Sequence, residues 1–376
     1  MFRHHPLEQR GRPKVEGQSQ RYIAAPLIEQ PIEFTVGHVE LIGLVARWQR
    51  HLIELRDIPS LDDVPSATRT LAKTFDYLLD LMRRIWSEGD ERIDRTGGGT
   101  RSIFGTQLRC DLSDGRVPLL TTKRVFWKAA AREMLWFLTG ETNIQPLLQL
   151  GVSIWSDWPL KKYREASGED MSQADFEQRI VADAGFAAQW GDLGPVYGKQ
   201  WVDWPTYEPT GDGHFKRGPG INQVAQVVES LRSNPGSRRH IIEGWTVAQL
   251  EEMALPPCHK TYQFHVAGDR LSCVLYQRSC DVALGLPFNL FGAALLTRMI
   301  AQQSGHEPGE LVWMGGDTHL YLNHAELVEE QLSREPSGDP RLAITRHPPS
   351  IFDYRFEDFA VTGYQPQGAI KAPVAV

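Results

Sequence analysis

Residues 263–277, QFHVAGDRLSCVLYQ, restrict the possible folds more than any other stretch of this sequence. Apolar and polar residues alternate along both halves, with Gly268 and Asp269 between them, which is the pattern of two antiparallel strands joined by a tight turn. The alternating apolar residues are Phe264, Val266, Leu271, Cys273 and Leu275. Residues 289–303, NLFGAALLTRMIAQQ, are apolar on almost every side, which predicts a buried helix. Together they predict a single α+β domain in which helices cover a mostly antiparallel or mixed sheet.

The rest of the chain divides into segments of different character. Residues 1–20 are polar, with arginine, proline and glycine interspersed, and are predicted to form a mobile tail. Apolar residues recur at helical spacing over 39–55 and again over 71–86, and each segment is predicted to be a helix. Residues 161–190 are charged and helix-forming and have no strand pattern, so we expect a surface insertion there.

Composition excludes several classes of function. The chain has 40 lysines and arginines against 47 acidic residues, a net charge of −7, so nucleic acid is an unlikely partner and any bound anion must be met by clustered arginines. The N-terminus has no apolar signal region, and the longest apolar stretch, 290–296, is too short to cross a bilayer, so we expect a soluble cytoplasmic protein. Four cysteines without a CxxC pair predict reduced thiols and no metal site.

One of these cysteines is in an unusual position. Cys258 follows Pro256 and Pro257, which force the chain into an extended conformation and would present the thiol rigidly. A cysteine of ordinary pKa is only about 3% thiolate at pH 7, so a nucleophile here needs nearby cations. The arginines of SRRH (237–240) and QRSCD (277–281) are candidates. From the residues alone, an inert buried thiol and a nucleophile both remain open.

A papain-like pairing of Cys258 with His259 is the obvious alternative for catalysis. The CGxCW signature of that class is absent, and adjacent residues in a strand point to opposite faces. His259 is therefore a poor general base for Cys258.

A set of long motifs, in a fixed order, identifies a family. They are DRTGGGT (94–100), LTTKR (120–124), GPVYGKQW (194–201), LPPCH (255–259), QRSCDVALGLPFN (277–289), GDTHLYLNH (316–324) and IKAPVAV (370–376). This set resembles the folate-dependent, homodimeric thymidylate synthases, a family that includes related deoxypyrimidine-nucleotide hydroxymethylases. The resemblance covers about 69–376, so 1–68 would be an N-terminal extension of the catalytic domain. It implies a thymidylate synthase-like α+β fold, with a mixed sheet packed against helices and a homodimer formed through the sheet.

The resemblance also implies a reaction. The family converts dUMP to dTMP, and 5,10-methylenetetrahydrofolate gives both the carbon and the hydride. Cys258 would add to C6 of the uracil ring, which makes C5 nucleophilic. Asn289 would read the uracil edge, since an amide can donate to O4 and accept from N3–H at once, whereas a carboxylate would suit cytosine. No metal is expected.

The remaining site residues are assigned by the same resemblance. A hydrogen-bonded network of Glu133, His319 and Asn289 would meet charge on O4, and Tyr197 would assist proton removal at C5. Residues expected to bind dUMP are Arg95, Arg238, Arg239, Arg278, Gln277, Ser279, Asn289, His319 and Tyr321. Residues expected to bind folate are Ile154, Trp155, Trp158, Asp281, Leu284, Gly285, Phe288 and Val376. Asp281, also counted as catalytic, would accept from the pterin, and the other subunit would supply Arg238 and Arg239.

Two stretches depart from the usual family sequence. After Arg239 the chain continues HIIEGWT, so His240, Glu243 and Thr246 are expected to put unusual polarity in or near the cleft. After His259 it continues KT, where small or apolar residues are commoner in the family. This leaves an alternative open, in which water rather than hydride captures the methylene intermediate and gives 5-hydroxymethyl-dUMP. Whether methylation or hydroxymethylation occurs depends on how well the site keeps water from the methylene intermediate. Trp155 and Leu255 are suited to shield that intermediate.

Overall fold

A computed structural model describes residues 66–93 and 98–373 of the chain. The predicted tail at 1–20 and the predicted helix at 39–55 lie outside these residues. The predicted helix at 71–86 falls within α2 (Ser66–Glu88) and is confirmed. No helix in the described part of the chain is both long and apolar enough to span a membrane.

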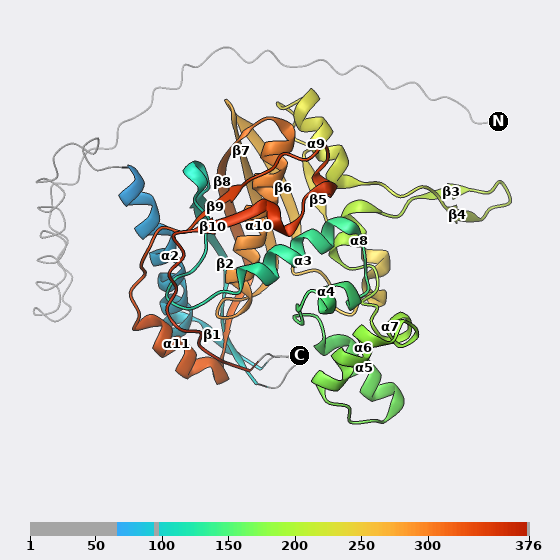
Figure 1. The fold of residues 1–376 in the computed structure, drawn as a ribbon, viewed down its shortest axis with the longest axis horizontal. Helices are drawn as coiled ribbons and strands as arrows, with labels where there is room; N and C mark the ends of the chain where they lie inside the picture. The colour runs from blue at the N-terminus through green and yellow to red at the C-terminus, as the bar shows by residue number, and fades with distance from the viewer. Residues whose placement is uncertain (1–65, 94–97, 374–376) are drawn as a thin grey trace, which may run out of the picture. The chain divides into compact units, whose positions relative to one another are not determined.

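A six-stranded mixed sheet is the centre of the fold, as Figure 1 shows, with strand order β1-β2-β8-β7-β6-β5. Its strands are β1 (Asp90–Arg92), β2 (Thr100–Asp111), β5 (Ile241–Glu243), β6 (His259–Ala267), β7 (Arg270–Asp281) and β8 (Glu307–Tyr321). Only β7 and β8 run parallel. The predicted hairpin is confirmed, because β6 pairs antiparallel with β7 up to Ala267 and Arg270. Gly268 in the turn has φ +63°, a conformation that favours glycine.

The two faces of this sheet have different surroundings. The residues Leu108, Trp313, Leu275, Tyr262 and Ile242 face one another across five strands and are at most 7% exposed. One residue further along, the facing set is Gln107, Met314, Tyr276, Thr261 and Glu243, all exposed or half-buried. We call these the inner and outer faces. Because side chains alternate along each strand, this register commits one face to the core and leaves the other uncovered.

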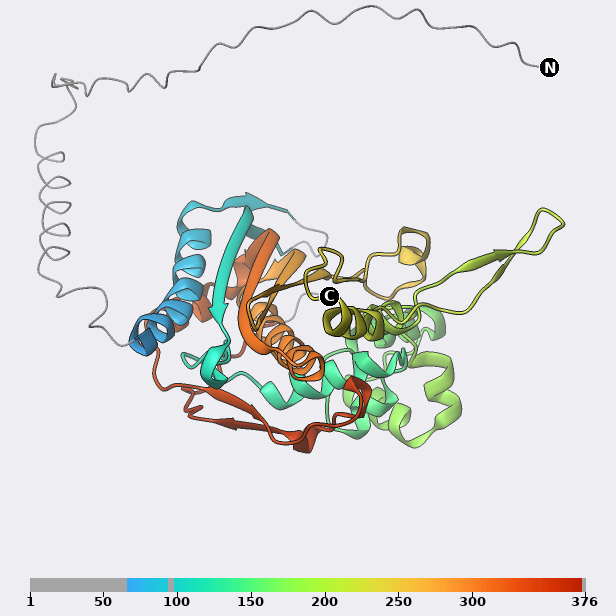
Figure 2. The same cartoon turned by 90° about the horizontal axis from the view of Figure 1, so that it is seen from above.

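Helices cover the inner face. Helix α10 (Gly285–Ser304) packs on β7, β8 and α3 (Trp127–Thr139), and its side chains are buried almost all round, as its sequence predicts (Figure 2). The other helices are α4 (Gln145–Gln149), α5 (Asp157–Ser167), α6 (Gln173–Ala182), α7 (Ala184–Trp190), α8 (Tyr197–Val202), α9 (Gln223–Ser233) and α11 (Ala325–Leu332). The expected α+β fold, with a mixed sheet packed against helices, is confirmed.

Two segments project from the main sheet. Helices α5 to α7 occupy most of residues 161–190 and share a small aromatic core of Tyr163, Phe176 and Phe186, with ring centroids 5.4 to 5.8 Å apart. Strands β3 (Tyr207–Pro209) and β4 (Phe215–Arg217) form a separate hairpin that extends outward in Figure 1. That residues 161–190 are an insertion stays a prediction.

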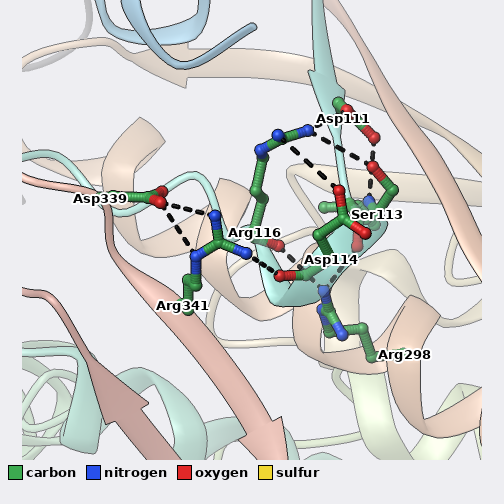
Figure 3. Close-up of polar contacts among 8 residues, drawn as sticks. Asp111, Ser113, Asp114, Arg116, Arg298, Asp339 and Arg341 are labelled. Atoms are coloured by element: carbon green, nitrogen blue, oxygen red, sulfur yellow. Dashed lines mark hydrogen bonds and ion pairs between the residues drawn. The ribbon is translucent and has the colours of Figure 1, made fainter. Parts of the chain in front are cut away.

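An ionic cluster ties the distal end of β2 to the ribbon of β9 (Arg341–Ile344) and β10 (Phe359–Thr362). Figure 3 shows Arg116 between two aspartates, with its guanidinium 2.6 Å from Asp111. Arg341 lies 2.6 Å from Asp339 and also donates to the carbonyl of Asp114, while the buried Arg298 of α10 donates to the carbonyl of Arg116 at 3.2 Å. Three chain segments are therefore fixed together at this end of the sheet.

Candidate active site

Cys258 lies immediately before β6, at the end of the two-proline segment, and is half-buried. All four cysteines are within the described residues, and none forms a disulfide. Arg278 of β7 binds the segment that carries the thiol. Its backbone N–H donates to the Cys258 carbonyl at 2.9 Å, and its guanidinium donates to the carbonyls of Pro257 at 2.9 Å and Pro256 at 2.7 Å. A cation is thus fixed next to the cysteine, as a thiolate nucleophile requires.

Tyr197 also contacts the segment that carries Cys258. It is the first residue of α8, and its hydroxyl accepts from the backbone N–H of Cys258 at 2.8 Å. Its ring lies on His259, with centroids 4.6 Å apart. Burial raises the pKa of Tyr197 well above its ordinary value, so the phenol keeps its proton. A Cβ at Gly198 would meet the Phe137 carbonyl at 2.1 Å, so glycine is what allows α8 to approach α3.

Glu133 reaches the site from α3, close enough to Tyr197 to interact with it electrostatically. The indole N–H of Trp155 donates to its carboxyl at 2.8 Å. Burial outweighs this hydrogen bond and raises the pKa of Glu133 to about 7. A carboxyl with such a pKa can give up or take a proton near neutral pH, which suits a general acid or base.

A chain of four hydrogen-bonded side chains lies beside these groups. Trp313 donates to Gln277 at 2.9 Å, and Gln277 donates to Asn289 at 2.8 Å. The Asn289 amide nitrogen lies 3.1 Å from Nε2 of His259. Gln277 also donates to the Ser279 carbonyl at 3.1 Å. We call Trp313, Gln277, Asn289 and His259 the amide relay.

The relay changes the interpretation of His259. Its imidazole is buried, which lowers its pKa to about 4 and keeps it neutral. Among the described residues, the histidine that contacts Asn289 is His259 and not His319, and the expected network of Glu133, His319 and Asn289 stays a prediction. His319 instead pairs with Asp317 at 3.2 Å. The sequence argument treated His259 only as a base for Cys258, and the LPPCH motif was the signal that could have included it.

The residues expected at the nucleotide's sugar and phosphate are only partly together. His319 and Tyr321 are neighbours at the end of β8, with ring centroids 5.3 Å apart. Arg238 and Arg239 lie in the exposed loop between α9 and β5, where neither guanidinium has a hydrogen-bond or ion-pair partner among the described residues. Arg95, like the folate candidate Val376, is outside the residues that the structure describes.

The folate candidates within the described residues lie on two segments, 154–158 and 281–288. The ring centroids of Trp155 and Trp158 are 5.2 Å apart. Trp155 is buried, with only 6% of its surface exposed, while the neighbouring Ile154 is exposed. Asp281 accepts from the backbone of Ala283 and Leu284 at 2.9 and 3.1 Å. This turn leads into α10, whose first residues include Gly285 and Phe288.

Lys123 of the LTTKR motif is a residue that the sequence argument left unassigned. It is 5% exposed, and burial lowers its pKa to about 8, while Asp281 nearby opposes this effect. Its ammonium donates to the carbonyl of Ala283, in the turn that Asp281 holds. Among the described residues, no group of three or more metal-ligating side chains could hold a metal ion.

The unusual polar residues pair with one another away from the amide relay. Glu243 lies 3.2 Å from the Lys260 ammonium and accepts from the Thr261 hydroxyl at 2.7 Å. A bulge at Lys260 gives β6 one extra residue, so His259 faces Gln277 on the inner side while Thr261 faces Tyr276 on the outer side. Glu243 and Thr261 therefore face the outer side of the sheet, and the expectation of unusual polarity in or near the cleft stays a prediction.

Comparison with known proteins agrees with this geometry. A thymidylate synthase family model matches residues 76–376. A thymidylate synthase of Novosphingobium aromaticivorans is 74% identical over 299 residues, covering 79% of this chain and 95% of the relative. A thymidylate synthase of Sphingopyxis alaskensis is 67% identical over 300 residues, covering 79% and 96%. The relationship inferred from the ordered motifs is thereby confirmed, and the chain belongs to the thymidylate synthase family.

Proposed function

We propose that this chain converts dUMP to dTMP by the thymidylate synthase reaction. The observation that carries the proposal is the meeting of Cys258, Arg278, Tyr197, Glu133 and Asn289 at one place within the matched family region. When bound, 5,10-methylenetetrahydrofolate supplies the one-carbon unit and the hydride. The site fits such a ligand, since the half-buried indole of Trp158 and the exposed side chain of Ile154 offer apolar contact next to Trp155, which donates to the Glu133 carboxyl.

Each residue has a role at a stated atom of the nucleotide. The Cys258 thiolate adds to C6, and Arg278 holds the segment that aims it. The Asn289 amide donates to O4 and accepts from N3–H. Glu133 exchanges a proton with the water or hydroxyl nearest O4, and the Tyr197 phenol positions the water that takes the C5 proton.

The phosphate would be bound by arginines from two subunits. Arg278 is already at the site, and Arg95 would join it from the same chain. Arg238 and Arg239 have exposed, unpaired guanidinium groups, which supports their donation to the site of a partner subunit. A phosphate carries close to two charges and the chain has a net charge of −7, so several local donors are needed.

The same proposal includes a homodimer formed through the outer face of the sheet. This face carries apolar side chains that none of the described helices covers: Tyr276 is 37% exposed, Met314 40% and Ile241 41%. A sheet with one uncovered apolar face gains stability by packing against another surface. A second copy supplies the same surface through a two-fold axis. Residues 1–68 remain proposed as an extension outside the catalytic domain, whose family match begins at residue 76.

The test of the proposed reaction is the fate of folate. With dUMP and 5,10-methylenetetrahydrofolate, we expect dihydrofolate to appear by absorbance in step with dTMP by mass spectrometry. A product that gains CH₂O without dihydrofolate would establish the hydroxymethylase instead. Glu243 and Thr261 face the outer side of the sheet, away from the amide relay, so their polarity does not favour that outcome.

The pKa of Glu133 predicts a stability effect with a definite sign. Because the pKa in the folded chain is raised to about 7, the associated stability is present in full below the unfolded value near 4.5 and is lost as the pH rises through about 7. Glutamine cannot ionise, so Glu133→Gln should raise the thermal midpoint relative to wild type more at about pH 8 than at about pH 5. The exposed Glu88→Gln is the control. An equal difference at both pH values would show that Glu133 is not desolvated.

A further inference from the structure

The amide relay contains Trp313, which contacts no proposed ligand. Its indole N–H is the first donor of the hydrogen-bond chain. Trp313 is 0% exposed and Gln277 2%, while Asn289, the member expected to meet the pyrimidine, is half-buried. The chain of hydrogen bonds therefore runs from a fully buried indole outward to the residue that would read the base. The question is what determines which way the two amides point.

Carboxamide side chains can be turned by half a rotation with almost no change of shape. Only their hydrogen-bond partners distinguish the oxygen from the nitrogen. An indole N–H can donate but never accept, so Trp313 requires the oxygen of Gln277 to face it. The nitrogen of Gln277 must then face Asn289, and a backbone carbonyl of Ser279 accepts its second hydrogen.

The orientation of the Gln277 amide determines the orientation of the Asn289 amide. Its oxygen accepts from Gln277, so its nitrogen faces His259. In this orientation the oxygen retains a lone pair for N3–H of a uracil, and the nitrogen retains a hydrogen for O4. Cytosine has an acceptor at N3 and a donor at its exocyclic amine, so it would meet like groups on both atoms. The orientation required by the indole is the one that accepts uracil.

The arrangement leaves one group unsatisfied. If Nε2 of His259 accepts from Asn289, a neutral imidazole carries its proton on Nδ1, and that atom is buried without a partner among the described residues. Turning both amides round would let Nε2–H donate to Asn289, but it would set the Gln277 nitrogen against the Trp313 N–H. Two donors facing each other repel, so the buried indole decides the orientation.

We propose that Trp313 is a positioning residue for base selection, because its N–H sets, through Gln277, the orientation in which Asn289 accepts dUMP and rejects dCMP. This inference rests on the proposed function only in taking dUMP as the substrate. It extends the specificity site to a residue on the inner face of β8 that no ligand reaches.

The test is Trp313→Phe, which removes the N–H and little else. Without that donor the two orientations of Gln277 become closer in energy, while the Ser279 carbonyl still favours the original one. We expect the ratio of dissociation constants for dCMP and dUMP, measured by calorimetry on the whole chain, to fall about tenfold, as for the loss of one buried hydrogen bond. Weaker dUMP binding should account for most of the change.

The chain offers a matched control. Trp201 is also 0% exposed, but its indole N–H is buried without a partner among the described residues, so Trp201→Phe removes a similar volume and no hydrogen bond. We expect that variant to keep the wild-type ratio. If both variants change the ratio equally, or if Trp313→Phe leaves it within about twofold, the proposal is wrong.

A second replacement covers the case in which Trp313→Phe does not fold. Placing 3-benzothienylalanine at position 313 keeps the shape of the indole and puts sulfur where the N–H was, so the same fall in the ratio is expected. An unchanged ratio with this residue overturns the proposal. The binding ratio also separates the role of Trp313 from the proposed reaction: failure of the wild-type chain to form dihydrofolate would remove the proposed reaction, and the ratio would still test Trp313.

Discussion

Cys258→Ala is expected to lower turnover by about 10⁴-fold or more while dUMP still binds. The thiolate is the group that forms the bond to C6, and no other described cysteine can replace it, since Cys110, Cys273 and Cys280 are at most 1% exposed. The phosphate and base contacts do not involve the sulfur, so the dissociation constant for dUMP should change little. Single-turnover dihydrofolate formation and calorimetry with dUMP measure the two effects.

Covalent trapping gives a direct readout of the same chemistry. With 5-fluoro-dUMP and the folate, the wild-type chain should gain the mass of both ligands on the peptide that contains Cys258, and the alanine variant should gain none. Cys110→Ala, on β2, is the control and should retain the adduct. Residual turnover of Cys258→Ala within about tenfold of wild type would contradict covalent catalysis at this residue.

Mixing two inactive variants is expected to restore activity if active sites are shared between subunits. Cys258→Ala lacks the nucleophile, and the double variant Arg238→Ala with Arg239→Ala lacks the donated arginines. In a mixed dimer one site carries both defects and the other carries neither. Random exchange makes about half of the dimers mixed, so the mixture should reach about a quarter of wild-type activity.

The activity of each variant alone and a control mixture make the mixing experiment decisive. Each variant alone should have almost no activity, since a phosphate without its bidentate donors binds poorly. The control is a mixture of Cys258→Ala with Glu133→Gln. Those residues lie in one site of one chain, so a mixed dimer then has a defect in both sites. No recovery with the arginine variant would show that its arginines serve their own subunit.

The sequence predicted those parts of the fold that local patterns determine. The β6–β7 hairpin follows from alternation around a two-residue turn, and α10 follows from an apolar surface with no polar side. The pairing of β2 with β8 was not predicted, because it joins segments about 200 residues apart that carry no local signal of each other. The aromatic core shared by α5, α6 and α7 was missed for a similar reason.

In the candidate site too, local motifs predict some features and contacts between distant residues determine the others. Cys258, Tyr197 and Asn289 could be assigned because long motifs carry them, whereas Glu133 lies outside those motifs and was assigned by the resemblance alone; the structure brings the four together. The hydrogen bond between Trp313 and Gln277 joins residues 36 positions apart and could not be predicted from spacing. Glu243 faces the outer side because it pairs with Thr261, whereas one extra residue in β6 turns His259 to the inner side, and composition does not encode such details of pairing.

The hairpin of β3 and β4 has a consequence for how chains of this kind can change in length. At its tip, a Cβ added to Gly211 or Gly213 would meet no atom within 4 Å. Extra residues at this tip leave the pairing of the main sheet unchanged, whereas one extra residue within β7 would turn its buried side chains to the opposite face. Related genes are therefore free to gain or lose codons in this loop, and a fluorescent reporter could be spliced in at the same place.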